Sequence, residues 1–375
     1  MPATNFGLPQ RYRALDGYRF IAASLIVLFH YDGDFGLGLG RITPIVKSLD
    51  VMVDFFFVLS GFVIAVTYSQ VMGSLRDYGS FLRRRLARVL PLHLAVLCIF
   101  IGFALANHFG VLKANHAEML DFAALPANAL LLHAWGTVGH LSFNAPSWSI
   151  SAEWLVYLLF PLLLVVSQRL PLIANLTLVA ASVAAIILFR NGMGLRDWTV
   201  ATYDFGALRA IPTFFLGVIF AVAVKDLPPS VRVPWPLVHA VFLSSIAILQ
   251  FGVPREVPIA MLALVVPLAA MAERGDKPSF MQTDFMARLG DASYSVYLIH
   301  IVAAIPVLFI LHKMHATGTP LAVASAVATY IGVVVAARLV YTRFEVPLRR
   351  WITGRRDKLS AVFAQRLRAV QSAVR

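Results

Sequence analysis

The first apolar segment of the chain contains three ionisable residues, Asp16, Arg19 and His30. Ionisable side chains are costly inside a membrane span, so they usually face a protein interior or a cavity and mark a functional site. Arg19 and His30 are eleven residues apart, about three helical turns, so they share one helix face roughly 16 Å apart along the axis. This spacing, with Asp16 one turn before Arg19, favours a functional stripe over an arginine that only reaches the interface.

The composition is that of a polytopic membrane protein. Hydrophobic residues make up 59% of the 375 residues and charged residues 14%, and the mean hydropathy is +0.77. Soluble domains carry about 25% charged residues. The net charge of +13 does not indicate nucleic-acid binding, because the lysines and arginines lie in loops beside apolar segments, where they set topology and meet anionic headgroups. The single cysteine, Cys98, excludes an intrachain disulfide.

The chain therefore predicts an all-α protein of about ten transmembrane helices. We expect both termini in the cytoplasm, because segments on that side would hold 22 lysines and arginines, against 7 on the other side. The apolar stretch within Glu118–Gly136 is expected to lie in the interface or to re-enter. The expected spans are 15–31, 50–70, 89–108, 147–167, 171–189, 206–224, 234–251, 256–272, 292–312 and 320–342.

Carboxylates are predicted beside His30 at the outer ends of the spans. Asp54 begins the second span, and Ser149 and Glu153 share a face at the beginning of the fourth. A carboxylate that orients an imidazole and stabilises its cation is the arrangement of a general base. The alternatives are a helix cap for Asp54 and a structural hydrogen bond for Glu153.

The cytoplasmic ends of the spans carry arginines. Arg85 and Arg88 are three residues apart and lie at a depth similar to that of Arg19. Such a cluster is either a topology signal or a phosphate clamp, because arginine forks match phosphate oxygens. Tyr297 and His300 share a face of the ninth span, as packing or as supporting groups. No histidine, cysteine or carboxylate spacing indicates a metal site.

These patterns resemble the membrane acyltransferase family 3, which includes bacterial O-antigen, exopolysaccharide, Nod-factor and macrolide acylases. The resemblance extends over nearly the whole chain. Tyr18 stands where the family usually has leucine, and Trp154 follows Glu153 where a second acidic residue is common. The matching segments, in chain order, are Leu15–Arg19 with His30, Val53–Gly61, Arg85–Arg88, Trp148–Glu153, Ser293–His300 and Phe344–Arg350.

The resemblance implies transfer of an acyl group, with acetyl expected, from cytoplasmic acyl-CoA to a hydroxyl of an exported carbohydrate or glycosylated molecule at the outer face of the bacterial cytoplasmic membrane. No permanently bound cofactor is expected, and the partners are acyl-CoA, the acceptor and membrane lipids. Arg85, Arg88 and Arg19 would hold the CoA phosphates. His30 would act as general base or carry the acyl group, oriented by Glu153 or Asp54.

A transporter or flippase for a lipid-linked sugar is the alternative, because it would also place charges inside spans. The absence of an internal repeat counts against it. The domain is expected to cover 1–354, followed by a basic cytoplasmic tail, 355–375. Many relatives carry an appended esterase-like domain that this chain is expected to lack, so acceptor handling is assigned to the membrane core or to a partner. The outer loops are expected to set the choice of acceptor, with Tyr203, Asp204 and Arg209 as candidates.

Overall fold

The structure is a computed structural model that describes residues 11–111, 116–275 and 277–354. Over these residues it contains helices and no strand, which confirms the predicted all-α class. Each of the ten expected apolar segments coincides with one long helix. These helices are α1 (Arg13–Asp34), α4 (Met52–Tyr68), α5 (Leu75–His108), α7 (Trp148–Arg169), α8 (Leu172–Gly192), α9 (Gly206–Asp226), α10 (Trp235–Ala247), α11 (Glu256–Ala272), α13 (Ser293–Lys313) and α14 (Pro320–Val340).

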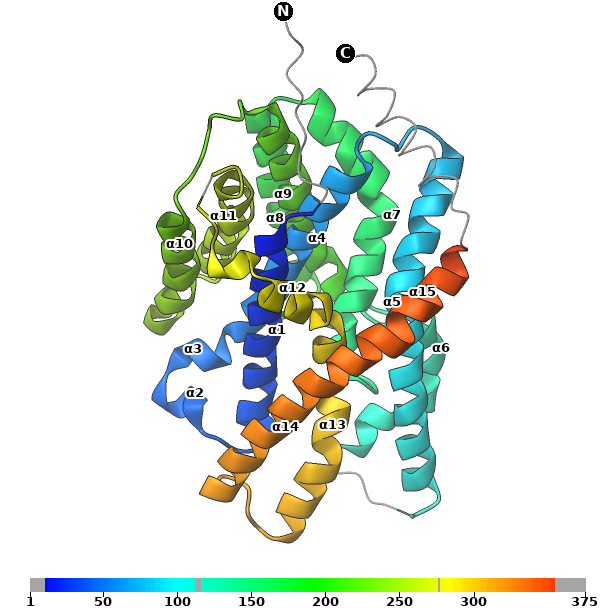
Figure 1. The fold of residues 1–375 in the computed structure, drawn as a ribbon. Coiled ribbons are helices and arrows are strands. Elements are labelled where there is room, and N and C mark those ends of the chain that lie inside the picture. The colour runs from blue at the N-terminus through cyan, green and yellow to red at the C-terminus, as the bar shows by residue number, and fades with distance from the viewer. Residues whose placement is uncertain (1–10, 112–115, 276, 355–375) are drawn as a thin grey trace, which may run out of the picture.

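Short elements join the long helices. In Figure 1, α1 and α12 lie in the middle of the molecule, with α10 and α11 on one side and α5 and α6 on the other. The short helices are α2 (Leu39–Ile42), α3 (Pro44–Lys47), α6 (Leu125–Ala129), α12 (Asp284–Asp291) and α15 (Val346–Thr353). The single turns are η1 (Leu49–Val51), η2 (Ala117–Leu120), η3 (Phe122–Ala124), η4 (Ala145–Ser147), η5 (Trp198–Val200), η6 (Ile248–Phe251), η7 (Phe280–Gln282) and η8 (Tyr341–Glu345), the last a π-helical turn.

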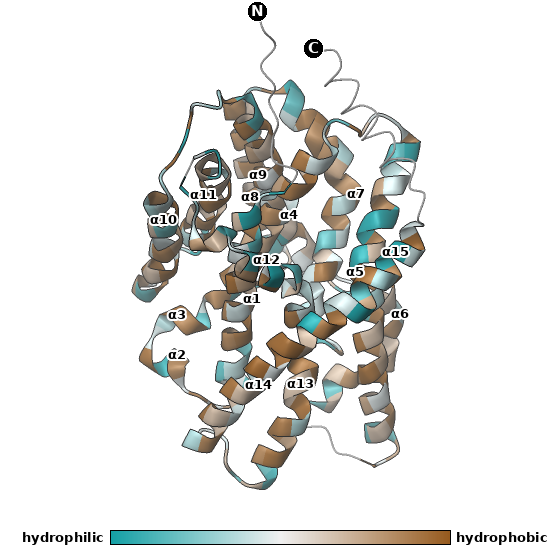
Figure 2. Ribbon diagram, viewed as in Figure 1, coloured by the Kyte–Doolittle hydropathy of each residue, from teal (hydrophilic) through white to brown (hydrophobic). Residues whose placement is uncertain are grey.

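Seven of the described helices are long and apolar enough to cross a membrane. The remaining three predicted spans are α10 and α11, which are shorter, and α1, which carries charges. Only 17% of the most apolar stretch of α8 and 22% of that of α14 is buried. Figure 2 shows hydrophobic residues predominating on α10, α13 and α14, whereas hydrophilic residues gather on α12 and α5. Apolar side chains exposed in this way are those expected to face lipid.

The helix α4 is held against α9 by a close backbone contact. A Cβ atom added at Gly61 would lie 2.1 Å from the carbonyl oxygen of Phe214, and one added at Gly217 would lie 2.1 Å from that of Val58. Small residues at such a crossing let two membrane helices pack backbone to backbone. This contact fixes the position of α4, which carries Asp54 and Ser60.

Replacing Gly61 by alanine is therefore expected to destabilise the fold by about 1–3 kcal/mol, because α4 and α9 must move apart to admit the methyl group. Thermal unfolding in detergent, followed by tryptophan fluorescence, measures the change. Gly102→Ala on α5 is the matched control, because a Cβ atom there would meet nothing within 4 Å. Equal melting temperatures for the two variants would contradict the close contact.

The long connection between α5 and α7 enters the protein interior. Asn128 and His133 are buried, the backbone N–H of Ala134 donates to Ser151 Oγ at 3.0 Å, and Trp135 Nε1 donates to the Ser151 carbonyl at 3.0 Å. This segment thus packs on the first turns of α7. The basic tail predicted at 355–375 lies outside the described residues.

Candidate active site

A cavity of about 210 Å³ lies between five helices. It brings together six of the residues predicted from the sequence: three arginines, Glu153, Ser149 and Tyr297. Its lining residues are Arg19 from α1; Val53, Phe56, Phe57, Ser60, Val63 and Ile64 from α4; Arg85, Arg88 and Val89 from α5; Ser149, Ile150, Glu153 and Tyr157 from α7; and Ser293, Tyr294 and Tyr297 from α13.

The three arginines leave guanidinium N–H groups available to a ligand. Arg19 forms a 3.2 Å ion pair with Asp16, and Arg85 donates to Tyr68 Oη at 3.3 Å while its buried Nε has no hydrogen-bond partner. The Arg88 guanidinium forms no ion pair or hydrogen bond with any described residue. Guanidinium groups that keep N–H donors free around one cavity are suited to a bound anion such as a phosphate.

Glu153 is the one carboxylate among the residues that line the cavity. Its Oε1 accepts a 2.5 Å hydrogen bond from Ser60 Oγ, and Tyr157 Oη lies 3.5 Å from the same hydroxyl. Glu153 therefore lies in the same cavity as the arginines, whereas the sequence placed it at the outer end beside His30. Within the described part of the chain, no hydrogen bond or ion pair joins Glu153 to His30.

The cavity has its arginines at one end and mostly apolar side chains at the other, where the Ser149 and Tyr297 hydroxyls are hydrogen-bonded to each other. Its α4 residues run from Val53 to Ile64, which corresponds to about 16 Å of helix. Arg85 bonds to Tyr68, at the last turn of α4, so the arginine end lies near the end of that helix. Phe56 packs its ring 6.0 Å from that of Tyr297, near the beginning of α4. The Ser60–Glu153 hydrogen bond lies between the two ends.

His30 and His300 form a pair beyond the apolar end. Tyr297 lines the cavity, and its ring lies 6.2 Å from that of His300. His300 Nδ1 donates to the Tyr297 carbonyl at 2.7 Å, which leaves Nε2 as an acceptor, 3.2 Å from His30 Nδ1. His30 Nδ1 also lies 3.0 Å from the Ile26 carbonyl, so it carries the proton. The lone pair of neutral His30 is consequently on Nε2.

This pairing replaces the predicted carboxylate contact. No carboxylate among the described residues forms a hydrogen bond or ion pair with His30. A second histidine and a backbone carbonyl instead fix its tautomer, which is the task usually given to a carboxylate. His30 itself does not line the cavity; its ring lies 5.0 Å from that of His300, which lies 6.2 Å from the ring of the cavity residue Tyr297.

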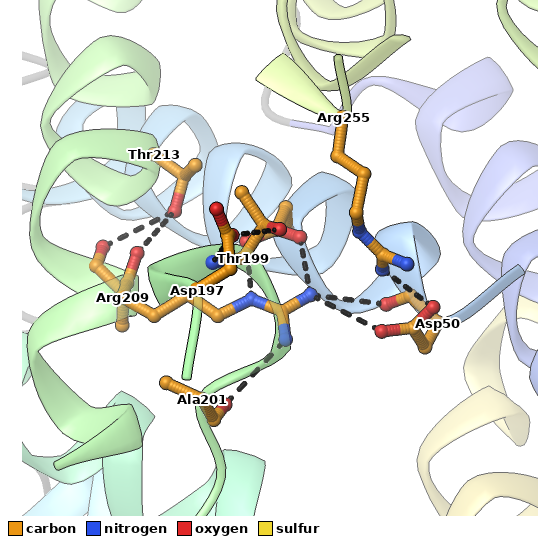
Figure 3. Close-up of polar contacts among 9 residues, drawn as sticks. Asp50, Asp197, Thr199, Ala201, Arg209, Thr213 and Arg255 are labelled. Atoms are coloured by element: carbon orange, nitrogen blue, oxygen red, sulfur yellow. Dashed lines mark hydrogen bonds and ion pairs between the residues drawn. The ribbon is translucent and has the colours of Figure 1, made fainter. Parts of the chain in front are cut away.

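Asp54 is paired with Arg209 and not with His30. Arg209 Nη2 and Nε lie 2.6 and 3.0 Å from the two carboxylate oxygens of Asp54, and both side chains are almost fully buried. Arg209 also lies 3.8 Å from Asp50, which forms a 2.5 Å ion pair with Arg255 (Figure 3). The prediction that Asp54 orients His30 therefore finds no support in these contacts, because the guanidinium occupies both oxygens.

Two of the residues predicted to set the choice of acceptor, Arg209 and Asp204, also form buried ion pairs. Arg209 is occupied by Asp54, and Asp204 accepts a 2.7 Å hydrogen bond from Arg190, which is buried as well. Both pairs join helices or loops inside the protein. They hold the structure together and leave little of either charge for a ligand.

Asp54→Asn is expected to cost about 3–5 kcal/mol of stability, because it leaves the buried Arg209 charge without its counter-charge. Thermal melting of the purified protein tests this. Asp50→Asn is the matched variant: its pair with Arg255 is partly exposed, with side chains 22% and 23% accessible, so we expect a loss of about 1 kcal/mol or less. A smaller effect at Asp54 than at Asp50 would refute the structural assignment.

Four polar residues of the cavity were missed in the sequence: Ser60, Tyr157, Ser293 and Tyr294. Tyr157 lies four residues after Glu153, so helical spacing alone places both on one face. Ser60 belongs to the Val53–Gly61 segment, but nothing in the sequence pairs it with Glu153, 93 residues later. Tyr294 donates to the Val89 carbonyl, which joins α13 to α5 beside the cavity.

The fold and the cavity define a helical membrane protein with a chamber lined by three arginines, and comparison with known proteins names its family. The sequence profile of the acyltransferase 3 family, described as "Acyltransferase domain", matches residues 12–338. The chain therefore belongs to this family and is an acyltransferase. This result sets aside the transporter alternative.

Two relatives resemble the chain. It is 28% identical to "Acyltransferase MdmB" of Streptomyces mycarofaciens, over 94% of this chain and 95% of that protein. It is 32% identical to "Protein 2 in picA locus" of Rhizobium radiobacter, over 40% of this chain and 80% of that protein. No solved structure matches the chain.

Proposed function

We propose that the protein transfers an acyl group, acetyl in the simplest case, from cytoplasmic acyl-CoA to a hydroxyl of an exported carbohydrate or glycosylated molecule at the outer face of the bacterial cytoplasmic membrane. The observation that supports this proposal is the cavity with three arginines at one end and an apolar end that leads toward the His30–His300 pair. The two ends of the cavity match the two ends of an acyl-CoA, because its phosphates would meet the arginines and its acyl group would lie at the opposite end.

Arg85, Arg88 and Arg19 bind the phosphates of the donor in this proposal. Arginine forks make short, charge-assisted hydrogen bonds to phosphate oxygens. Pockets for drug-sized ligands are about 300–1,000 Å³. A cavity of about 210 Å³ therefore accommodates the acyl end and part of the pantetheine arm, while the nucleotide remains at the cytoplasmic mouth.

His30 supplies the base. In the direct route, the acceptor oxygen forms a bond to the thioester carbon as its proton passes to His30 Nε2, the carbon–sulfur bond breaks, and the proton returns to the CoA thiolate. In the covalent route, Nε2 forms a bond to the thioester carbon as the carbon–sulfur bond breaks and CoA leaves as the thiolate. The acceptor oxygen then takes the acyl carbon from Nε2, and the acceptor proton ends on the CoA thiolate. Both routes use the same lone pair on Nε2 and give the same products, an ester and CoA.

Titration of acetyl-CoA into the purified protein in nanodiscs tests the donor assignment. We expect saturable binding of acetyl-CoA, and weaker binding of acetyl-pantetheine, which lacks the phosphates. If acetyl-pantetheine bound as tightly as acetyl-CoA, the arginines would not bind the phosphates of the donor. No binding of acetyl-CoA to folded protein would contradict the proposed donor.

A further inference from the structure

The apolar end of the cavity is closed. Val53 and Ile150, which line it, are 4% and 3% exposed, and Phe57 is 2% exposed. Phe56 lies edge-on to Tyr297, whose hydroxyl donates to the Pro146 carbonyl at 2.8 Å. An acyl chain that enters from the arginine end therefore meets packed side chains at this end.

This closed end is also held in place. Val53 and Phe56 are on α4, which packs backbone to backbone against α9 around Gly61. Ile150 is on the first turns of α7, which the Ala134 and Trp135 hydrogen bonds to Ser151 tie to the segment before it. Protein interiors are close-packed and yield little to an added methylene. The volume at this end is consequently a property of the fold.

We propose that Val53, Phe56 and Ile150 determine which acyl chains the enzyme accepts, and that they restrict it to short chains. This inference rests on the proposed function, because it takes the arginine end as the phosphate site. With phosphates there, the acyl chain points to the closed end, and each further carbon of the chain must displace these side chains. Discrimination against one extra methylene in a packed apolar pocket is about 10- to 200-fold.

The opposite ends of the cavity offer a matched pair of variants. Val53 and Val63 are the same residue type on the same helix and both line the cavity, but Val63 lies ten residues nearer the arginine end. The measurement is the ratio of the dissociation constants of butyryl-CoA and acetyl-CoA in nanodiscs. We expect Val53→Ala to shift this ratio at least about tenfold toward butyryl-CoA, and Val63→Ala to leave it unchanged within about twofold.

A variant with the opposite expected effect on the binding ratio distinguishes a change of specificity from a loss of folding. Val53→Leu fills the closed end, and we expect it to weaken binding of propionyl-CoA more than that of acetyl-CoA. Monodisperse elution on size exclusion verifies that each variant is folded.

Two results would overturn the inference while the proposed function stands. In one, acetyl-CoA binds but neither Val53 variant changes the ratio; in the other, Val63→Ala changes it as much as Val53→Ala. Failure of the wild-type protein to bind any acyl-CoA would overturn the proposed function together with the inference.

Discussion

Replacement of His30 by alanine is expected to lower kcat of acyl transfer by about 10²- to 10⁴-fold, the usual contribution of a general base. The hydrogen bonds at Nδ1 assign the free lone pair to Nε2, so the ring is held ready to accept a proton. The substitution removes this lone pair and leaves the three arginines of the cavity in place. Acetyl-CoA binding is therefore expected to remain within a few-fold of the wild type.

The matched control for His30 is His312. Its Nδ1 lies 2.7 Å from the Leu308 carbonyl, the same bond to a residue four positions earlier that His30 makes to Ile26. His312 lies on the exposed surface of α13 and does not line the cavity. We expect His312→Ala to keep wild-type kcat. A His30→Ala enzyme that retains kcat within tenfold of the wild type would exclude His30 as the base or as an acyl carrier.

The double variant Arg85→Ala, Arg88→Ala is expected to raise the dissociation constant of acetyl-CoA by about 100-fold or more. A hydrogen bond to a charged group contributes about 1.5–3 kcal/mol, and this variant removes two guanidinium groups. Weaker dependence of the remaining affinity on salt concentration is expected as well, because fewer charges meet the phosphates. Calorimetric titration at two salt concentrations measures both effects.

Arg76→Ala serves as the control for this variant. Arg76 is on the first turn of the same helix, is exposed and does not line the cavity. Removing its charge changes the net charge of the protein without touching the cavity. Similar losses of affinity for Arg76→Ala and for the double variant would mean that the arginines act through general surface charge. That result would favour the alternative in which Arg85 and Arg88 are only a topology signal.

Much of the fold followed from the sequence because hydrophobic periodicity and length fix where membrane helices form. Each expected apolar segment coincides with a long helix. The grouping of Arg19, Arg85 and Arg88 was predicted as well, since all three were placed at the same depth of their spans, and the structure brings them to one cavity.

The partners of the carboxylates did not follow from the sequence. The prediction placed the first residues of the fourth span at the outer face and the first residues of the ninth at the inner face. In the structure Ser149, near the beginning of α7, lies 2.7 Å from Tyr297 Oη, near the beginning of α13. The helix ends are thus staggered, because the segment between α5 and α7 enters the protein. Depth counted from the ends of spans therefore did not predict which side chains meet in the cavity.

The long-range ion pairs could not be predicted from the sequence either. Asp54 and Arg209 are 155 residues apart, and the sequence assigned Asp54 to His30 and Arg209 to the acceptor. A buried arginine and a buried aspartate on different helices can pair with each other or with a substrate, and only the packing of α4 on α9 decides between these. The His30–His300 bond joins residues 270 positions apart and depends in the same way on tertiary structure.

The most direct test of the account is the sidedness of transfer. Membrane vesicles from the source cells, prepared with either face outward, would receive acetyl-CoA labelled in the acetyl group, and label in carbohydrate would be counted. We predict incorporation when the cytoplasmic face is outward, little when the outer face is outward, and none with the His30→Ala protein. Incorporation only when the outer face receives acetyl-CoA, or equal incorporation in vesicles that lack the protein, would contradict the account.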